Sequence, residues 1–178
     1  MKWLLKLFGI GKAKAKMPKT MVRIASKEIG IEEIGNSNKG PRVDEYKSAT
    51  WMDATDSWPW CAAFVCWVVQ QAMGKLGYAQ TPTFRRPKTP RAFGFEEWCL
   101  RQDGTVKLKC IPGTDILPGD IVVFNFSHVG IASSKCSGDG RFECIEGNTD
   151  ALGSREGGGV FKKVRHTNLV LSRIRFTK

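Results

Sequence analysis

DSWPWCAAFVCWVV, residues 56–69, places a cysteine between a Trp-Pro-Trp turn and a run of helix formers. Ser57 and Pro59 suit the approach to a helix, and the apolar run predicts a helix over residues 61–73 that ends at Gly74. Cys61 would then lie among unpaired backbone N–H groups at the positive end of the helix dipole, which favours a thiolate. The alternative is that Cys61 only packs in the core, because free cysteine is commonly buried.

The segments on either side of this helix predict the fold class. Helical spacing covers residues 19–29, a second short helix fits within 42–50, and residues 80–115 form an irregular excursion with a short helix within 90–102. Five short β-type segments follow, at residues 119–126, 128–134, 141–148, 159–166 and 169–176. Helices followed by an antiparallel meander predict an α+β fold, with the N-terminal helices packed on one side of a C-terminal antiparallel sheet.

Net positive charge is concentrated at the two ends of the chain. The 178 residues carry a formal net charge of +11, with no acidic residue from Met1 to Lys27 and none after Glu156. The length suits one domain, and we expect an N-terminal segment at 1–19 followed by a domain at 20–178. The charge predicts an anionic target. Nucleic acid ranks below other targets because no matching motif occurs, and we expect a monomer.

The first residues, MKWLLKLFGIGKAKAK, predict a cationic amphipathic helix. Lys6 interrupts the apolar stretch, no small-residue cleavage site follows, and a membrane span needs about 20 apolar residues, so we expect neither a signal peptide nor a transmembrane helix. Trp3 and Phe8 fall on the apolar arc, while Lys2 and Lys6 fall outside it. These four residues are candidates for binding an anionic membrane or outer envelope. Alternatively, the apolar face packs on the domain, or the segment is disordered.

The six cysteines contain no Cys-x-x-Cys pair, and only two histidines occur. A zinc site is therefore poorly supported. Without a signal peptide, the simplest interpretation is a set of reduced thiols in a protein made in a cytosol.

Two segments downstream of Cys61 contain residues that could serve as its base and as the partner of that base. His128 begins a predicted strand in NFSHVGIA, where a lone histidine is more often structural. In CIEGNT, Glu146 and Asn148 are two residues apart and would point to the same side of an extended strand. A carboxylate or amide beside an imidazole fixes its tautomer and stabilises its cation. Helix cysteine, strand histidine and a polar partner together predict a thiol hydrolase.

Several motifs, taken in order, carry a resemblance to a known family. PWCAAFV, LPGDIVVF, SHVGI, IEGN and GGGVFKKVR resemble the CHAP amidases and peptidases of the NlpC/P60 cysteine-hydrolase superfamily, over residues 20–178. The resemblance implies a papain-like fold and hydrolysis of an amide bond in peptidoglycan. It implies Cys61 as nucleophile, His128 as base, and Glu146 or Asn148 as the group that orients His128. Residues 81–109 match no part of the family pattern and could shape a particular substrate cleft or bind the envelope.

Further expectations concern the surroundings of Cys61. Trp58 and Trp60 flank it and could wall a substrate groove, although both could equally be core. Some relatives bind calcium upstream of the cysteine, where Asp53 and Asp56 lie. Two carboxylates fall short of the six to eight oxygen ligands that calcium takes, so we expect no metal and no other cofactor.

The resemblance leaves three functional classes. The first is a phage endolysin, made in the host cytoplasm without a cleavable signal peptide and acting on the bacterial cell wall. The second is an interbacterial toxin with the same chemistry. The third is a non-catalytic module bound to the envelope or to a phage tail, against which the retained Cys61, His128 and Glu146 argue.

Overall fold

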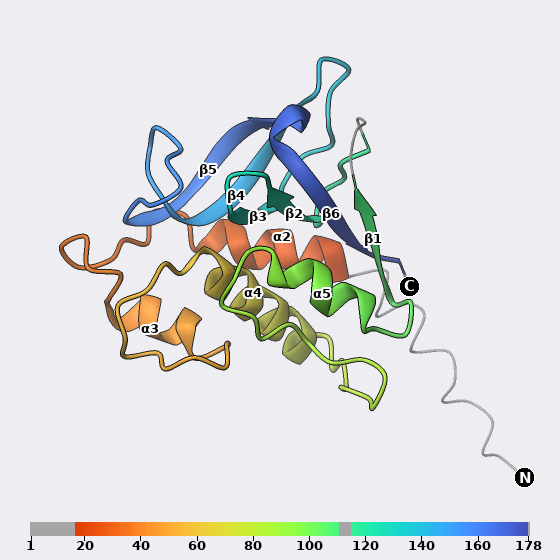
Figure 1. The fold of residues 1–178 in the computed structure, drawn as a ribbon, viewed down its shortest axis with the longest axis horizontal. Helices are drawn as coiled ribbons and strands as arrows, with labels where there is room; N and C mark the ends of the chain where they lie inside the picture. Colours follow the sequence, from red (N-terminus) through yellow and green to blue (C-terminus); the bar gives the residue numbers. More distant parts are fainter. Residues whose placement is uncertain (1–16, 111–114, 178) are drawn as a thin grey trace, which may run out of the picture.

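The computed structural model describes residues 17–110 and 115–177 (Figure 1). Its helices are α2 (Met17–Lys27), α3 (Pro41–Lys47), α4 (Cys61–Lys75) and α5 (Gly94–Leu100), with a short 3-10 turn at Thr167–Leu169. Its strands are β1 (Val106–Cys110), β2 (Ile121–Phe124), β3 (His128–Ala132), β4 (Arg141–Thr149), β5 (Gly159–His166) and β6 (Val170–Phe176). The expectations for Lys2, Trp3, Lys6 and Phe8 lie outside the described residues.

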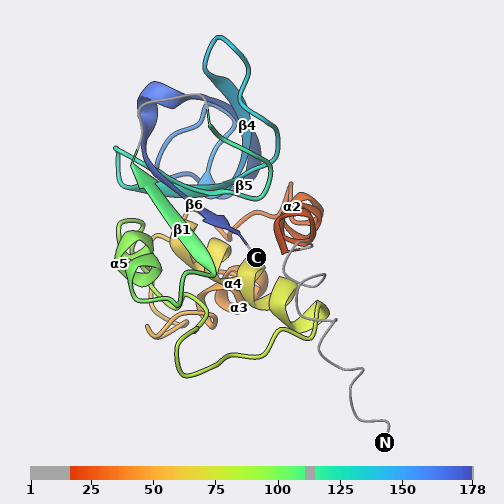
Figure 2. The ribbon, with the colours of Figure 1, turned by 90° about the vertical axis from the view of Figure 1, so that its right-hand side faces the viewer.

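All six strands form one antiparallel sheet in the order β1-β6-β2-β3-β4-β5. Strands β2 to β5 follow the predicted meander. Strand β6, predicted as its fifth strand, departs from it, because β6 crosses back to pair with β2 on one side and β1 on the other. The helices lie together on one side of the sheet, which curls strongly above them (Figure 2). The predicted α+β class is therefore confirmed.

Strand β1 corrects the prediction that residues 80–115 contain no strand. It is an edge strand, paired with β6 from Val106 opposite Phe176 to Cys110 opposite Ser172. Five residues are too short a stretch for alternation to stand out, and the strand depends on its tertiary partner. The short helix expected within the same segment is α5.

Helix α4 is the centre of the main core. Eleven of its 15 residues are buried, so it is apolar all round rather than amphipathic. It packs against β3 and β4 above and against α2 and α3 beside it. The prediction that Gly74 ends the helix was wrong. The helix continues to Lys75, and the residue with the left-handed conformation after it is Gly77, at φ +64°.

The curled sheet separates two apolar clusters. Alternate residues of β2 show this directly, because Ile121 and Val123 belong to the main core beside the helices, while Val122 and Phe124 belong to a smaller cluster on the other face. Cys61 belongs to the main core, whereas the His128 ring stacks on Phe124 of the second cluster. No helix among the described residues is long and apolar enough to cross a membrane.

Candidate active site

Cys61 is the first residue of α4 and is 7% exposed. The helix begins here because Pro59 cannot continue it backwards, and the bond from Phe64 N–H to the Trp60 carbonyl, at 2.9 Å, closes the first turn. Since α4 is held on all sides by the core, the thiol has a fixed position at a helix N-terminus.

His128 is the first residue of β3 and is fully buried. A tight turn precedes it, in which Ser127 takes a left-handed φ of 61° and its N–H donates to the Phe124 carbonyl. The imidazole stacks on Phe126, with ring centroids 5.8 Å apart and planes 13° apart. Turn and ring stack together fix the plane of the imidazole.

Glu146 lies on β4, the neighbour of β3, and its side chain reaches His128 on β3. Its Oε2 lies 3.1 Å from His128 Nε2, and both side chains are fully buried. Gly130 makes this crossing feasible, because a Cβ there would lie 2.6 Å from both Glu146 Cγ and Cys144 Sγ. Neither ring nitrogen makes a hydrogen bond of ordinary geometry with a described residue, so the contact is close but poorly aligned. Such alignment is common in catalytic sites without substrate.

Arg165 of β5 holds the other side of the Glu146 carboxylate. Its Nε donates to Oε1 at 2.8 Å and its Nη2 to Oε2 at 2.5 Å. The guanidinium also lies over the rings of Phe124 and Phe126, 5.5 and 5.3 Å from their centroids. Burial opposes ionisation of Glu146, but the bonds from Arg165 and the neighbouring His128 outweigh it and lower the pKa of Glu146.

The environment of His128 favours its cation. Burial alone would lower its pKa, but the electrostatic attraction of Cys61 and of Glu146 outweighs burial and raises the pKa to about 9. Cys61 and Glu146 are thus the two groups whose charge the imidazole responds to. A buried histidine with a raised pKa beside a carboxylate is typical of a general acid or base.

Asn148 does not share the position of Glu146, which corrects the prediction that both point to the same side. The pairing of β4 with β5 shifts register between Glu146 and Thr149, and Asn148 has a left-handed φ of 57°. Its Oδ1 instead accepts the backbone N–H of Trp60 at 3.3 Å. Gly147 allows the close approach, since a Cβ there would lie 2.8 Å from Trp60 and Phe64. Asn148 thus ties the end of β4 to the start of α4.

The two tryptophans beside Cys61 have different surroundings. Trp60 is fully buried, stacks on Tyr46 and donates from Nε1 to Glu33, so it cannot wall a groove, and that expectation is corrected. Trp58 lines the cavity at Cys61. The Lys47 ammonium lies 5.1 Å from the centroid of the Trp58 ring. The Lys47 ammonium donates to the backbone carbonyls of Asn38 and Asp56.

The residues present do not fit calcium. The Asp53 carboxylate accepts from the N–H and the hydroxyl of Thr55, and the carbonyl of Asp56 already receives the Lys47 ammonium. Within residues 17–110 and 115–177, no group of three or more His, Cys, Asp or Glu side chains is placed to hold a metal ion. A positive charge is already built into this loop, which disfavours a second one.

A cavity of about 300 Å³ opens at Cys61. One wall comes from Met52, Trp58 and Pro59, and the other from residues 90–94 with Glu97. Ser127 and Arg155 complete the lining. The Cys61 thiol is therefore reached from a cavity between the approach to α4 and residues 90–97.

Sequence reasoning missed Arg165 and Lys47. Arg165 was counted only among the basic residues near the end of the chain, although its position on a strand next to the CIEGN strand was a usable signal. Nothing in the local sequence marks Lys47 as fully buried.

Comparison with known proteins bears on the family and the fold. The family model of the CHAP domain matches residues 53–148, which is more than half of the chain, and the protein belongs to this family. The fold is similar to that in the crystal structure of the wild-type endolysin LysIME-EF1, with a TM-score of 0.52 and 15% sequence identity. The match covers 89% of this chain but only 63% of the endolysin chain. No curated protein matches the sequence.

Proposed function

We propose that this protein is a peptidoglycan hydrolase that cuts an amide bond of the cell-wall stem peptide, in the manner of an endolysin. The observation that carries the proposal is the placement of His128 between Cys61, at a helix N-terminus, and the Arg165-bound carboxylate of Glu146. Membership of the CHAP family and the fold shared with an endolysin support the substrate class.

The proposed mechanism starts from a thiolate on Cys61 and an imidazolium on His128. His128 holds the proton of Cys61, and the thiolate attacks the amide carbonyl to form a tetrahedral oxyanion. The N–H of Cys61, in the first turn of α4, has no partner within the helix and is available to that oxyanion. The imidazolium then protonates the leaving amine, which leaves a thioester on Cys61. Water, deprotonated by His128, cleaves the thioester and restores the thiol.

Glu146 acts through His128 and is its orienting group in this proposal. The carboxylate contacts the imidazole nitrogen Nε2, which leaves the other ring nitrogen for Cys61. Arg165 is a positioning residue, since it keeps the Glu146 carboxylate ionised and fixed. Asn148 positions the start of α4 and is not part of the proton path.

The test is digestion of purified peptidoglycan by the wild type and by Cys61→Ala, followed by mass spectrometry of the fragments. We expect fragments from the wild type alone. A new amino-terminal alanine on the stem peptide would identify an amidase, and a new terminus within the peptide would identify an endopeptidase. Cys99→Ala is the matched control, because burial raises the pKa of that thiol to about 11 and it lies away from the cavity.

Equal digestion by wild type and Cys61→Ala would refute the thiol mechanism. Absence of fragments from a correctly folded wild type would refute the proposal that peptidoglycan is the substrate.

A further inference from the structure

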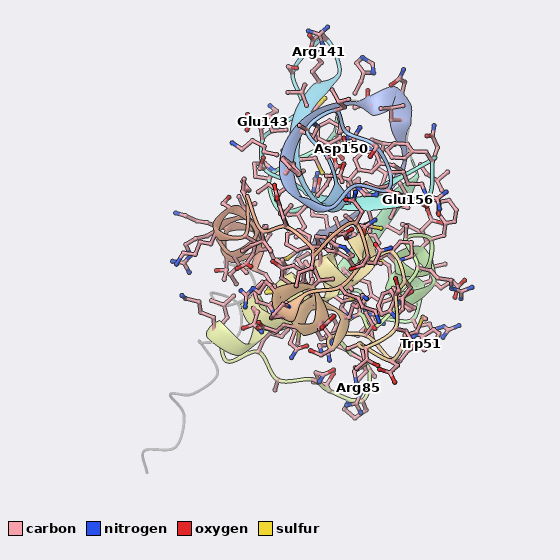
Figure 3. All side chains as sticks on the ribbon, turned by 90° about the vertical axis from the view of Figure 1, so that its left-hand side faces the viewer. Trp51, Arg85, Arg141, Glu143, Asp150 and Glu156 are labelled. Carbon is pink, nitrogen blue, oxygen red and sulfur yellow. The ribbon has the colours of Figure 1, made fainter. Side chains whose placement is uncertain are left out.

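A second cavity, of about 450 Å³, adjoins the one at Cys61. The two share Arg91, Gly94 and Glu97 in their walls, so they lie side by side. The second cavity extends away from the thiol towards Trp51 and Arg85. Figure 3 shows these two residues on the helical side of the molecule, at the opposite end from Arg141.

The lining of this second cavity is strongly cationic. Arg85, Lys88, Arg91 and Arg101 contribute four positive charges against the single carboxylate of Glu97. All four cations are exposed, and none forms an ion pair within the part of the chain that the structure describes. Elsewhere in the domain, several arginines are neutralised by carboxylates, as Arg173 and Arg175 are by Asp115. The groove thus keeps its charge available.

The cavity walls are built by hydrogen bonds between the connecting loop and α5. Trp98 Nε1 donates to the Arg85 carbonyl at 2.6 Å, and the Gln102 carboxamide accepts the Arg85 N–H at 2.8 Å while donating to the Trp98 carbonyl at 2.7 Å. The N–H of Trp51 donates to the Lys88 carbonyl. A backbone fixed in this way holds in place the Cα atoms that carry the cationic side chains. Less conformational entropy is then lost when a ligand binds.

We propose that this cationic cavity is a subsite that binds an anionic group of the cell-wall polymer while an adjacent amide lies at Cys61. Guanidinium groups suit carboxylates and phosphates, to which they donate in pairs. The exposed ring of Trp51, at 66% exposure, offers an apolar face beside them. The proposal rests on the proposed function, since it assigns the part of the same substrate that lies beyond the cleaved bond. The anion is either a free carboxylate of the peptide or a phosphate of an attached wall polymer.

The test compares two triple variants that remove the same charge. Arg85→Gln/Lys88→Gln/Arg101→Gln empties the cavity of three cations and leaves Arg91 in place. The control, Lys19→Gln/Arg23→Gln/Lys135→Gln, removes three exposed cations from α2 and from the loop between β3 and β4. Both are made in a Cys61→Ala background, and binding to purified sacculi is measured by sedimentation. Binding is thereby separated from hydrolysis.

We expect the cavity variant to bind at least about tenfold more weakly and the control to bind within about twofold of the parent. Equal weakening by both would show general attraction to an anionic wall, and no weakening by either would show solvated surface charge. Each of these two results overturns the proposal. A binding difference of this kind, together with no hydrolysis by the protein with its native Cys61, would contradict the proposed function while leaving the subsite intact.

The source of the anion is identified with modified sacculi. One sample has its phosphate polymers removed with acid, and another has its carboxyl groups converted to amides. The difference between the two triple variants should vanish on one of these samples and persist on the other. If it persists on both, no anion is being recognised and the proposal fails. With an active Cys61, the cavity variant should raise KM while kcat changes by less than about twofold.

Discussion

Glu146 is held between two cations, with Arg165 donating two hydrogen bonds to its carboxylate and His128 Nε2 lying 3.1 Å from Oε2. The buried carboxylate is thereby kept ionised, and its pKa is lowered. The same charge helps to raise the pKa of His128. The Arg165 ion pair and the contact with His128 therefore share a single carboxylate.

Glu146→Gln removes the charge but keeps the shape. We expect kcat to fall by about 10² to 10⁴, because the imidazolium loses its stabilising partner. The His128 pKa should fall below about 9, as followed by NMR of the ring. Arg165 would be left without its partner, and the free energy of unfolding should drop by about 3–5 kcal/mol. Glu143→Gln, on the same strand but exposed, is the control. Wild-type turnover in Glu146→Gln would refute the role of Glu146.

The raised pKa of His128 predicts an alkaline limit. Because the folded-state pKa of about 9 lies above the ordinary 6.5, the stabilisation from the imidazolium is complete below about pH 6.5 and is lost as pH rises through about 9. Turnover should fall over the same upper limb, since the leaving amine then lacks its proton donor. Rate profiles and urea unfolding measure both effects. His166→Gln, which changes the other histidine, should keep the wild-type profile. A fall in turnover centred near pH 6.5 would contradict the raised pKa of His128.

Asn148→Gly separates the two roles that Asn148 could have. Glycine tolerates the left-handed φ, so the substitution removes only the acceptor of the Trp60 N–H. We expect a loss of about 1–3 kcal/mol in unfolding free energy, the cost of one buried unpaired donor. The NMR pKa of His128 should stay at its wild-type value. A clear shift of that pKa would mean that Asn148, and not only Glu146, orients the imidazole.

Chelation should leave activity unchanged. The loop before Cys61 holds the Lys47 ammonium at the Asp56 carbonyl, and the Asp53 carboxylate is engaged by Thr55. Digestion measured in excess EDTA, and again after calcium is added back, should match the untreated rate within experimental error. Loss of activity in EDTA that calcium restores would show a metal site that these residues do not provide.

Deletion of residues 2–14 tests the cationic amphipathic segment. The deletion ends before Met17, which is fully buried and must be kept for α2 to pack. We expect weaker binding to vesicles of anionic lipid and unchanged hydrolysis of purified peptidoglycan. Vesicles of neutral lipid are the control. If hydrolysis falls together with vesicle binding, the segment is part of the folded domain.

The sequence was sufficient to predict the elements that carry the reacting groups. An apolar run after Trp-Pro-Trp predicted α4 with Cys61 at its start, and short β-type segments between turns predicted β3 and β4 with His128 and Glu146. The separation of Asn148 from Glu146 could not be predicted, because it depends on a register shift against β5 and on one left-handed residue. Long-range pairing likewise decides β1 and the reach of Arg165.

The connection between α4 and β1 carries much of the groove. Residues 82–102 supply most of the second cavity and one wall of the first, whereas Cys61, His128, Glu146 and Arg165 stand on α4, β3, β4 and β5. Under the two proposals, bond breaking and polymer recognition belong to separate stretches of the chain. One loop could be grafted from a relative to redirect the enzyme to another wall, with the chemistry left as it is.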